Sequence, residues 1–175
     1  MISDRLDKTI RTVPNFPKEG VNFKDITPLL MDSNISSDII DAFISALDGI
    51  DIDAVVGIES RGFLFGFLLA NKLGVPFIPI RKAGKLPGKT LKYKYNLEYG
   101  SAEVEIHKSD IKKGWKVLVH DDLLATGGTA CAAAELIQGL GANVSAFAFV
   151  IALDFLNGKE EIKKYSDNII SLKNY

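Results

Sequence analysis

Residues 116–130 read KVLVHDDLLATGGTA, and this stretch decides the fold class. A short apolar run ends in two acids, and a pair of glycines then opens a segment rich in alanine. A second segment repeats this order, because AVVGIE at 54–59 is followed by SRG and a long apolar stretch. Each run is typical of a buried parallel strand that leads into a helix.

Glycines mark where the two helices should end. We expect helices over 62–73 and 128–140, followed by Gly74 and Gly141, which suit a helix C-terminus. Strands that alternate with helices imply an α/β domain with a mostly parallel sheet. In such sheets ligands gather at the carboxyl ends of the strands, where both acid-and-glycine turns lie.

Other elements are weaker predictions. Residues 75–80 and 144–153 are further β-like runs, and a helix is expected over about 37–47 with Ser36 or Ser37 as its cap. Residues 13–28 contain three prolines and Gly20, which predicts an irregular loop. Residues 81–98 mix glycine, proline and lysine before an alternating run that resembles a strand.

Size and composition favour one domain over residues 1–175, because 47% hydrophobic residues suffice for one sizeable core. Lysine plus arginine (21) nearly balance aspartate plus glutamate (22), which predicts no general affinity for nucleic acid or an acidic membrane. The longest apolar run falls short of the roughly 20 residues of a membrane span. A single cysteine excludes an internal disulfide and suits a reducing cytoplasm, and two distant histidines argue against structural zinc.

The sequence ATGGT at 125–129 predicts an anion site. Thr126 and Thr129 offer hydroxyls, and the two glycines let backbone N–H groups turn inward at the start of a helix. No lysine follows, so this is not a nucleotide-hydrolysing P-loop. The other turn, GIESRG, has P-loop spacing, but Phe63 and Leu64 stand where lysine and a hydroxyl residue are required.

The neighbouring acids restrict what the anion can be part of. A carboxylate about 4 Å from a phosphate would cost on the order of 4 kcal/mol at an effective dielectric near 20. Asp121 and Asp122 must therefore face something else, such as sugar hydroxyls or a magnesium ion that the ligand brings. This predicts a phosphosugar, although an acid pair that only caps the strand is the alternative.

A second anion site is predicted by six basic residues without an acid between Arg81 and Lys94. Such a run is often a solvated face, but here glycines and a proline interrupt it after a β-run, as in a mobile loop over a polyphosphate. Arg61 in the other turn could hold the same group through two hydrogen bonds. Two anion sites around an acid pair describe a ribose with a phosphate at one end and a diphosphate at the other.

With these residues identified, VLVHDDLLATGGTA resembles the phosphoribosyl-diphosphate motif of the type I phosphoribosyltransferases. The segments NFPKEGVNFKDITPLL, ESRGFLFG, IRKAGKLPG and LEYG are similar to members of that family that use adenine. The resemblance implies the conversion of adenine and 5-phosphoribosyl 1-diphosphate to AMP and pyrophosphate in purine salvage, with Mg2+, in a cytoplasmic homodimer. It also implies a mostly parallel sheet flanked by helices, a small base-binding hood and a mobile catalytic loop.

The resemblance also assigns roles to residues. The 5-phosphate would be held by Ala125, Thr126, Gly127, Gly128 and Thr129, and the ribose hydroxyls by Asp121 and Asp122. The diphosphate turn, which in this family often contains a non-proline cis peptide, would be Glu59, Ser60, Arg61 and Gly62, with positive charge added by Arg81, Lys82 and Lys85. Phe23 would stack on adenine while backbone groups of Asn22 and Lys24 read its edge. Glu98 would handle the proton at adenine N7, and Tyr99 would close beside it.

One position favours adenine among the purines. Transferases for 6-oxopurines commonly carry aspartate where this chain has Ala125, so here Glu98 would have to supply the acid near N7. The orotate enzymes also lack that acid, but the segments around Phe23 and LEYG argue against them.

Two other function classes are alternatives. A regulator could sense the diphosphosugar without turnover, but such proteins usually add a nucleic-acid-binding segment, and none is visible. A phosphorylated receiver domain could use VHDD as its acidic pocket, but receivers place such a pair near the first strand. Among the remaining polar residues, His120 is expected to be a core histidine with one hydrogen bond, His107 a surface residue, and Cys131 a structural residue whose pKa a helix start could lower.

Overall fold

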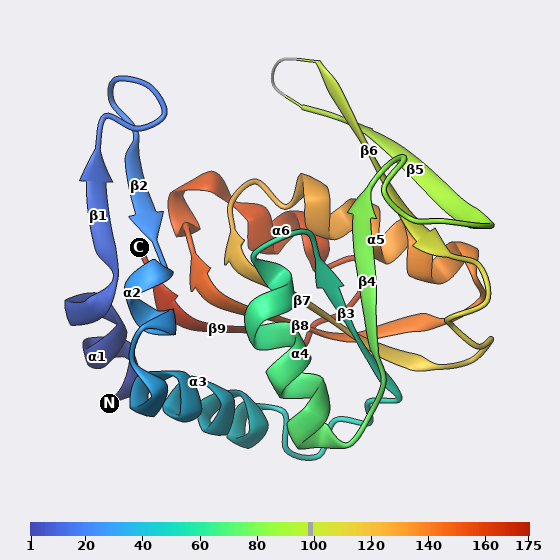
Figure 1. The fold of residues 1–175 in the computed structure, drawn as a ribbon, viewed down its shortest axis with the longest axis horizontal. Coiled ribbons are helices and arrows are strands. Elements are labelled where there is room, and N and C mark those ends of the chain that lie inside the picture. The colour runs from blue at the N-terminus through green and yellow to red at the C-terminus, as the bar shows by residue number, and fades with distance from the viewer. Residues whose placement is uncertain (98–99) are drawn as a thin grey trace.

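The computed structural model describes residues 1–97 and 100–175. Its central sheet has seven strands in the order β5-β6-β4-β3-β7-β8-β9 (Figure 1). The five strands of the parallel part are β3 (Ala54–Ile58), β4 (Phe77–Lys82), β7 (Lys116–Leu124), β8 (Asn143–Ala152) and β9 (Ile169–Asn174). An antiparallel hairpin of β5 (Thr90–Asn96) and β6 (Ser101–His107) extends the sheet beside β4. The prediction of an α/β fold with a mostly parallel sheet is confirmed.

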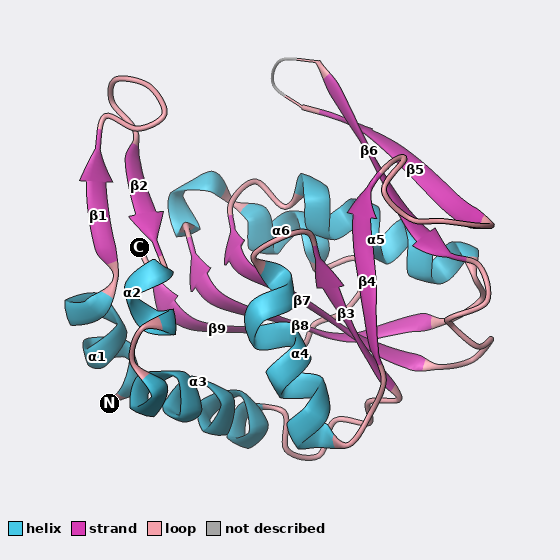
Figure 2. Ribbon diagram, viewed as in Figure 1, coloured by secondary structure: helices cyan, strands magenta, loops and turns pink. Residues whose placement is uncertain are grey.

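Helices cover both faces of this sheet (Figure 2). One face carries α5 (Gly128–Gly139), and the other carries α1 (Ile2–Thr9), α3 (Ser33–Ala46) and α4 (Gly62–Leu73). Short helical segments complete the chain: α2 (Thr27–Leu30), η1 (Asp154–Leu156) and α6 (Gly158–Ile162). None of the helices in the described ranges is long and apolar enough to cross a membrane.

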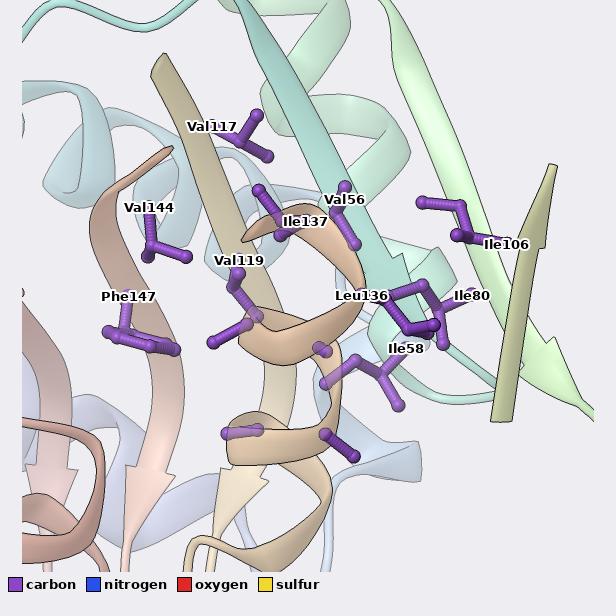
Figure 3. Packing of buried hydrophobic residues seen from close by; sticks show 14 of the residues in the cluster. Val56, Ile58, Ile80, Ile106, Val117, Val119, Leu136, Ile137, Val144 and Phe147 are labelled. Atoms are coloured by element: carbon purple, nitrogen blue, oxygen red, sulfur yellow. The ribbon is translucent and has the colours of Figure 1, made fainter. Parts of the chain in front are cut away.

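The core follows from alternation along the buried strands. Val56 and Ile58 of β3 point toward α5 and pack in one cluster with Leu136 and Ile137 (Figure 3). Val55 points the other way and packs with α3 and α4. Because both faces are covered, these strands are continuously apolar, as the sequence pattern indicates.

The predicted C-terminal ends of the helices agree with the structure within a residue. Helix α4 spans the expected 62–73, and Gly74 after it has φ of 71° in the left-handed region that glycine favours. Helix α5 ends at Gly139, one residue before the prediction. Helix α3 begins earlier than predicted, at Ser33, because the carboxylate of Asp32 accepts N–H bonds from Asn34 and Ile35.

Two predictions for the N-terminal part are wrong. Ser36 does not cap α3, because its hydroxyl donates to the carbonyl of Leu29. Residues 13–28 are not simply an irregular loop, since they contribute to a separate antiparallel pair of β1 (Arg11–Pro14) and β2 (Asn22–Asp25). This hairpin stands apart from the main sheet near the C-terminal end of the chain (Figure 1).

Candidate active site

The two acid-and-glycine turns lie side by side at the carboxyl edge of the sheet. Strands β3 and β7 are direct neighbours, so the turns that follow them meet. They touch at Gly62, where a Cβ would stand 2.9 Å from the carbonyl oxygen of His120 and 3.0 Å from Oδ1 of Asp121. Glycine at this position is therefore what lets the turns approach, and it brings Arg61 beside Asp122.

The ATGGT turn forms a small open cavity of about 80 Å³, lined by Asp121, Leu123, Leu124, all residues of 125–130 and Phe149. This is room for several water molecules or a group of phosphate size. Gly127 has φ of 88° and precedes the first turn of α5, and the first residues of that helix line the cavity. The first N–H groups of a helix have no partner within the helix, so they suit an anion. The structure thus places adjacent residues of one turn around a cavity, and the binding of an anion there stays a prediction.

Asp121 lines this cavity, and the acid pair that it forms with Asp122 is only partly satisfied. Oδ1 of Asp121 accepts the N–H of Asp122 at 2.9 Å, while Asp122 itself is buried. Nε of Arg61 lies 3.0 Å from Oδ2 of Asp122, but its N–H is not aimed at that oxygen, which has no hydrogen bond within the described part of the chain. A buried carboxylate oxygen without a donor is a binding position for a hydroxyl or a cation.

The charge of the pair is correspondingly unstable in the free protein. Burial, and then the neighbouring charge of Asp122, raise the pKa of Asp121 well above its ordinary value. Burial also raises the pKa of Asp122, although Arg61 opposes this shift. A ligand that brings hydroxyl donors or a cation would remove both penalties.

Glu59, the acid of the turn after β3, is fully surrounded by hydrogen-bond donors, unlike the acid pair. Glu59 accepts hydrogen bonds from Nζ of Lys85 at 2.8 Å, from the Arg81 guanidinium at 3.2 and 3.3 Å, and from the N–H of Lys82 at 2.9 Å. Burial alone would raise its pKa, but these donors hold the pKa of Glu59 at about 2. Its peptide bond to the exposed Ser60 is cis, in agreement with the family resemblance. The turn therefore gathers the basic residues 81, 82 and 85 at one carboxylate.

Arg61 also reaches the hairpin of β1 and β2. Its Cζ lies 5.4 Å from the centroid of the Phe23 ring, and that ring packs edge to face on Phe16 with centroids 5.2 Å apart. Phe23 is half-buried, so the hairpin presents an aromatic face toward the acid pair. Arg61 thus lies between the aromatic ring and the carboxylate of Asp122.

The residues on either side of Phe23 are arranged differently. The side chain of Lys24 donates to Oγ1 of Thr12 at 3.0 Å and places its ammonium 3.8 Å from the centroid of the Tyr175 ring. Strand β2 pairs only with β1, so alternate backbone N–H and C=O groups face away from that partner. Asn22 and Lys24 are two residues apart, so their backbone N–H and C=O groups point to the same side of the strand.

Four further residues named in the sequence analysis remain to be considered. Glu98 and Tyr99 lie outside the described residues. Burial raises the pKa of the Cys131 thiol, so the start of the helix does not lower it, and the interpretation of Cys131 as a structural residue stays a prediction. His120 is fully buried as expected, but neither ring nitrogen makes a hydrogen bond within the described chain, and the Ala148 backbone lies beside the ring without reaching hydrogen-bond geometry.

Sequence reasoning missed two supports of the ATGGT turn. Gly158 at the start of α6 packs against it so closely that a Cβ there would stand 2.2 Å from the carbonyl oxygen of Ala125. Tyr95 of β5 reaches it from the other side, with its hydroxyl 3.1 Å from Oγ1 of Thr129. Gly158 stands in a glycine-bearing segment, LNGKEE, that could have signalled a close contact, whereas nothing in the sequence links Tyr95 to Thr129.

Comparisons with known proteins identify the class to which this fold and site belong. The family model of the phosphoribosyl transferase domain matches residues 31–174. The parallel sheet with the acid pair and phosphate-sized cavity at its carboxyl edge is thus the type I phosphoribosyltransferase fold.

Relatives narrow the class further. The chain is 52% identical over 161 residues to the adenine phosphoribosyltransferase of Alkaliphilus metalliredigens, covering 92% of this chain and 95% of that one. The crystal structure of adenine phosphoribosyltransferase from Thermoanaerobacter pseudethanolicus superposes with a TM-score of 0.95 at 45% identity over 100% of both chains. The Saccharomyces cerevisiae enzyme, complexed with an imino-altritol bisphosphate and adenine, gives 0.90 at 44% identity over 98% of both chains. The chain belongs to the adenine phosphoribosyltransferases.

Proposed function

We propose that this protein transfers the phosphoribosyl group of 5-phosphoribosyl 1-diphosphate to adenine, giving AMP and pyrophosphate in purine salvage. The observation that carries the proposal is the acid pair, in which half-buried Asp121 lines the cavity at 125–130 and buried Asp122 has an oxygen that accepts no hydrogen bond from the described residues. A phosphosugar supplies both a phosphate for the cavity and hydroxyls for the acids. The adenine phosphoribosyltransferases to which the chain is similar support the choice of base.

The sugar end of the substrate is held by the second turn. Backbone N–H groups of Gly127 and Gly128, with the hydroxyls of Thr126 and Thr129, bind the 5-phosphate, and the methyl of Ala125 lies beside them. Asp121 and Asp122 accept hydrogen bonds from the ribose hydroxyls. Their negative charge also stabilises the positive charge that develops at the anomeric carbon as the diphosphate departs.

The diphosphate is held by the first turn. Backbone groups of Ser60 and Gly62 face it, and Arg81, Lys82 and Lys85 form its cationic wall, oriented by Glu59. Arg61 leaves Asp122 and turns its guanidinium to the diphosphate, so the ribose hydroxyls take over the carboxylate that it vacates. These cations stabilise the leaving group as its charge grows.

The base is held by the hairpin. Adenine stacks on Phe23, and backbone groups of Asn22 and Lys24 on the open edge of β2 read its polar edge. Adenine reacts as the tautomer that carries its imidazole proton on N7, so N9 has a free lone pair. N9 forms the new bond to the anomeric carbon, the bond from that carbon to the diphosphate oxygen breaks, and Glu98 takes the proton from N7. Tyr99 closes beside it and excludes the water that would otherwise compete with the base. A positioned acid or base contributes about 10²- to 10⁴-fold, which sets the effect expected for Glu98→Gln.

Magnesium accompanies the diphosphosugar in this proposal. The described residues contain no cluster of three or more metal-ligating side chains, so a cation would depend mainly on substrate oxygens. Asp121 and Asp122 fit the remaining positions, because a divalent ion prefers carboxylate oxygens and would lower their raised pKa values. When bound, the ion supplies charge neutralisation on the diphosphate. Removal of magnesium with a chelator is expected to abolish turnover.

The decisive experiment mixes the protein with the diphosphosugar, magnesium and each of adenine, hypoxanthine, guanine and orotate, and measures pyrophosphate release. We expect release with adenine and little with the other bases. No release with adenine would refute the proposed function. Binding of the diphosphosugar without turnover, unchanged by Glu98→Gln, would instead favour a non-catalytic sensor.

We also propose that the protein is a cytoplasmic homodimer, as the resemblance implies. Helix α4 supports the dimer, because its exposed face carries Leu64, Phe67 and Leu68 with 41%, 58% and 46% of their surface accessible. Such neighbouring apolar side chains are typical of a protein interface. Sedimentation equilibrium should give twice the mass of one chain, and a monomeric mass would contradict the proposal.

A further inference from the structure

The hairpin of β5 and β6 is anchored to helix α5 at two glycines. A Cβ at Gly139, the last residue of the helix, would stand 2.9 Å from Cδ2 of Leu91. At the first residue, Gly128, a Cβ would stand 3.8 Å from Cδ2 of Tyr95. Leu91 and Tyr95 are four residues apart on β5 and so lie on the same face of the strand. The ring of Tyr95 therefore rests on the residue that opens the ATGGT helix.

The hydroxyl of Tyr95 completes this contact. It lies 3.1 Å from Oγ1 of Thr129, and either oxygen could donate. Tyr95 and Thr129 are both half-buried, which limits competition from water. Thr129 also lines the cavity of about 80 Å³, so one hydroxyl is shared between the hairpin and the anion site.

An anion in the cavity would settle which oxygen donates. This step depends on the proposed function, in which the anion is the 5-phosphate of the sugar. A phosphate dianion only accepts hydrogen bonds, and the Thr129 hydroxyl has one proton, so Thr129 donates to the phosphate. Its oxygen then needs a donor, which the Tyr95 hydroxyl supplies. Hydrogen bonds that run in one direction polarise one another and strengthen the last bond of the chain.

We propose that Tyr95 is a positioning residue for the 5-phosphate: its hydroxyl donates to Thr129 and orients the Thr129 proton toward the phosphate. Tyr95 acts through Thr129 and does not touch the substrate. Its role belongs to binding of the phosphate and is separate from the chemistry at the anomeric carbon.

Tyr95→Phe tests this proposal, because it removes the hydroxyl and keeps the ring on Gly128. Loss of one hydrogen bond of this kind should weaken AMP binding and raise KM for the diphosphosugar by about 3- to 10-fold. Binding of adenosine, which has no phosphate, and KM for adenine should stay the same. The kcat should change less than twofold, and calorimetry with AMP and adenosine measures the difference directly.

Tyr93→Phe is the matched control. Tyr93 lies on the same face of β5 with 37% of its surface exposed, and in the described chain it makes no hydrogen bond to the ATGGT turn. Removing its hydroxyl should leave the affinities for AMP and adenosine unchanged. Thermal unfolding of both variants separates a loss of the fold from a loss of phosphate binding.

A double-mutant cycle tests the route through Thr129. In a Thr129→Ala background, Tyr95→Phe should cause no further loss of AMP affinity, because the shared proton is gone. The proposal is overturned if the two losses multiply, or if Tyr95→Phe weakens AMP and adenosine equally. Ribose 5-phosphate gives the same comparison without a base, so a protein that proves inactive with adenine can still support or refute the role of Tyr95.

Discussion

The two turns at the carboxyl edge of the sheet carry acids in the same place but use them differently. In the turn after β3, Glu59 is surrounded by Lys85, Arg81 and a backbone N–H, and its pKa falls to about 2. At the carboxyl end of β7, burial and the neighbouring charge of Asp122 raise the pKa of Asp121. Oδ2 of Asp122 pairs with Arg61 at 3.0 Å but accepts no hydrogen bond from the described residues. The first acid is paired with cations of the protein, whereas the second pair is only partly satisfied by the described residues.

This difference shows that an acid in a ligand-binding turn is not by itself evidence of its role. A satisfied carboxylate stabilises the fold and positions its neighbours. An unsatisfied buried carboxylate lowers the stability of the free protein and contributes when ligand arrives. Substitutions that remove each charge should therefore change stability in opposite directions.

The largest effect is expected from Asp121→Asn. Asparagine keeps the shape of the side chain and the oxygen that accepts the Asp122 N–H. It removes the negative charge that would stabilise the positive charge developing at the anomeric carbon. We expect kcat/KM to fall about 10²- to 10³-fold. Because a half-buried charge beside a second acid is lost, the free energy of unfolding should rise by about 1 kcal/mol.

Steady-state kinetics and urea unfolding of the same preparation check both parts. A variant that is less active and less stable would show that Asp121 is a structural acid, and the contrast between the two turns would fail.

The next effect concerns His120, which lies in β7 directly before the acid pair. Burial lowers the pKa of this ring from 6.5 to about 4. At a pH between these two pKa values, His120 binds a proton in the unfolded chain but not in the folded chain. The free energy of unfolding therefore falls as pH decreases from about 6.5 to 4. The shift corresponds to about 3 kcal/mol by the end of this window.

Urea unfolding at several pH values measures this slope. Replacement by an aliphatic residue, His120→Val, should reduce the slope between pH 6.5 and 4 whatever its effect at neutral pH. Equal slopes in the two proteins would mean that other groups cause the acid sensitivity.

Glu59→Gln has the smallest expected effect, and it tests the turn in which the acid is already paired with cations. Glutamine keeps the size of the side chain but leaves Arg81 and Lys85 without their counter-charge. We expect the free energy of unfolding to fall by about 2 kcal/mol at pH 7, through loss of charged hydrogen bonds. In the wild type the same contribution should disappear as pH falls from 4.5 toward 2, since the folded pKa is depressed.

The measurement is chemical denaturation of both proteins at pH 7 and at pH 3. We expect a smaller difference between their stabilities at pH 3 than at pH 7, because the contribution is lost only as pH approaches 2. If Glu59→Gln were neutral at pH 7, the cluster around Glu59 would not stabilise the fold.

Local patterns predicted the elements whose identity is set by their own residues. The apolar runs around Val56 and Val119 required burial on both faces, and Gly74 required a helix end. The ATGGT turn was also predictable, because its ligand groups are consecutive in the chain.

Features that depend on distant residues were not predictable in this way. The hairpin of β1 and β2 was interpreted as a loop, since its prolines and glycine conceal two short strands that pair only with each other. The cap of α3 was misplaced because Asp32 and the serines after it are all good caps, and tertiary contacts decide among them. The contacts of Glu59 with Lys85 and of Tyr95 with Thr129 join segments 26 and 34 residues apart.

The lysines of β5 have a further consequence for the sheet as a whole. Strand β5 is one of its two outermost strands, and an outermost strand exposes unpaired backbone groups that can recruit another chain. Lys92 and Lys94 are both exposed there, opposite Glu105 and Glu103 on β6. Two cations on this border would repel the same strand of a second molecule, so we expect the basic segment to disfavour pairing between β5 strands of two molecules.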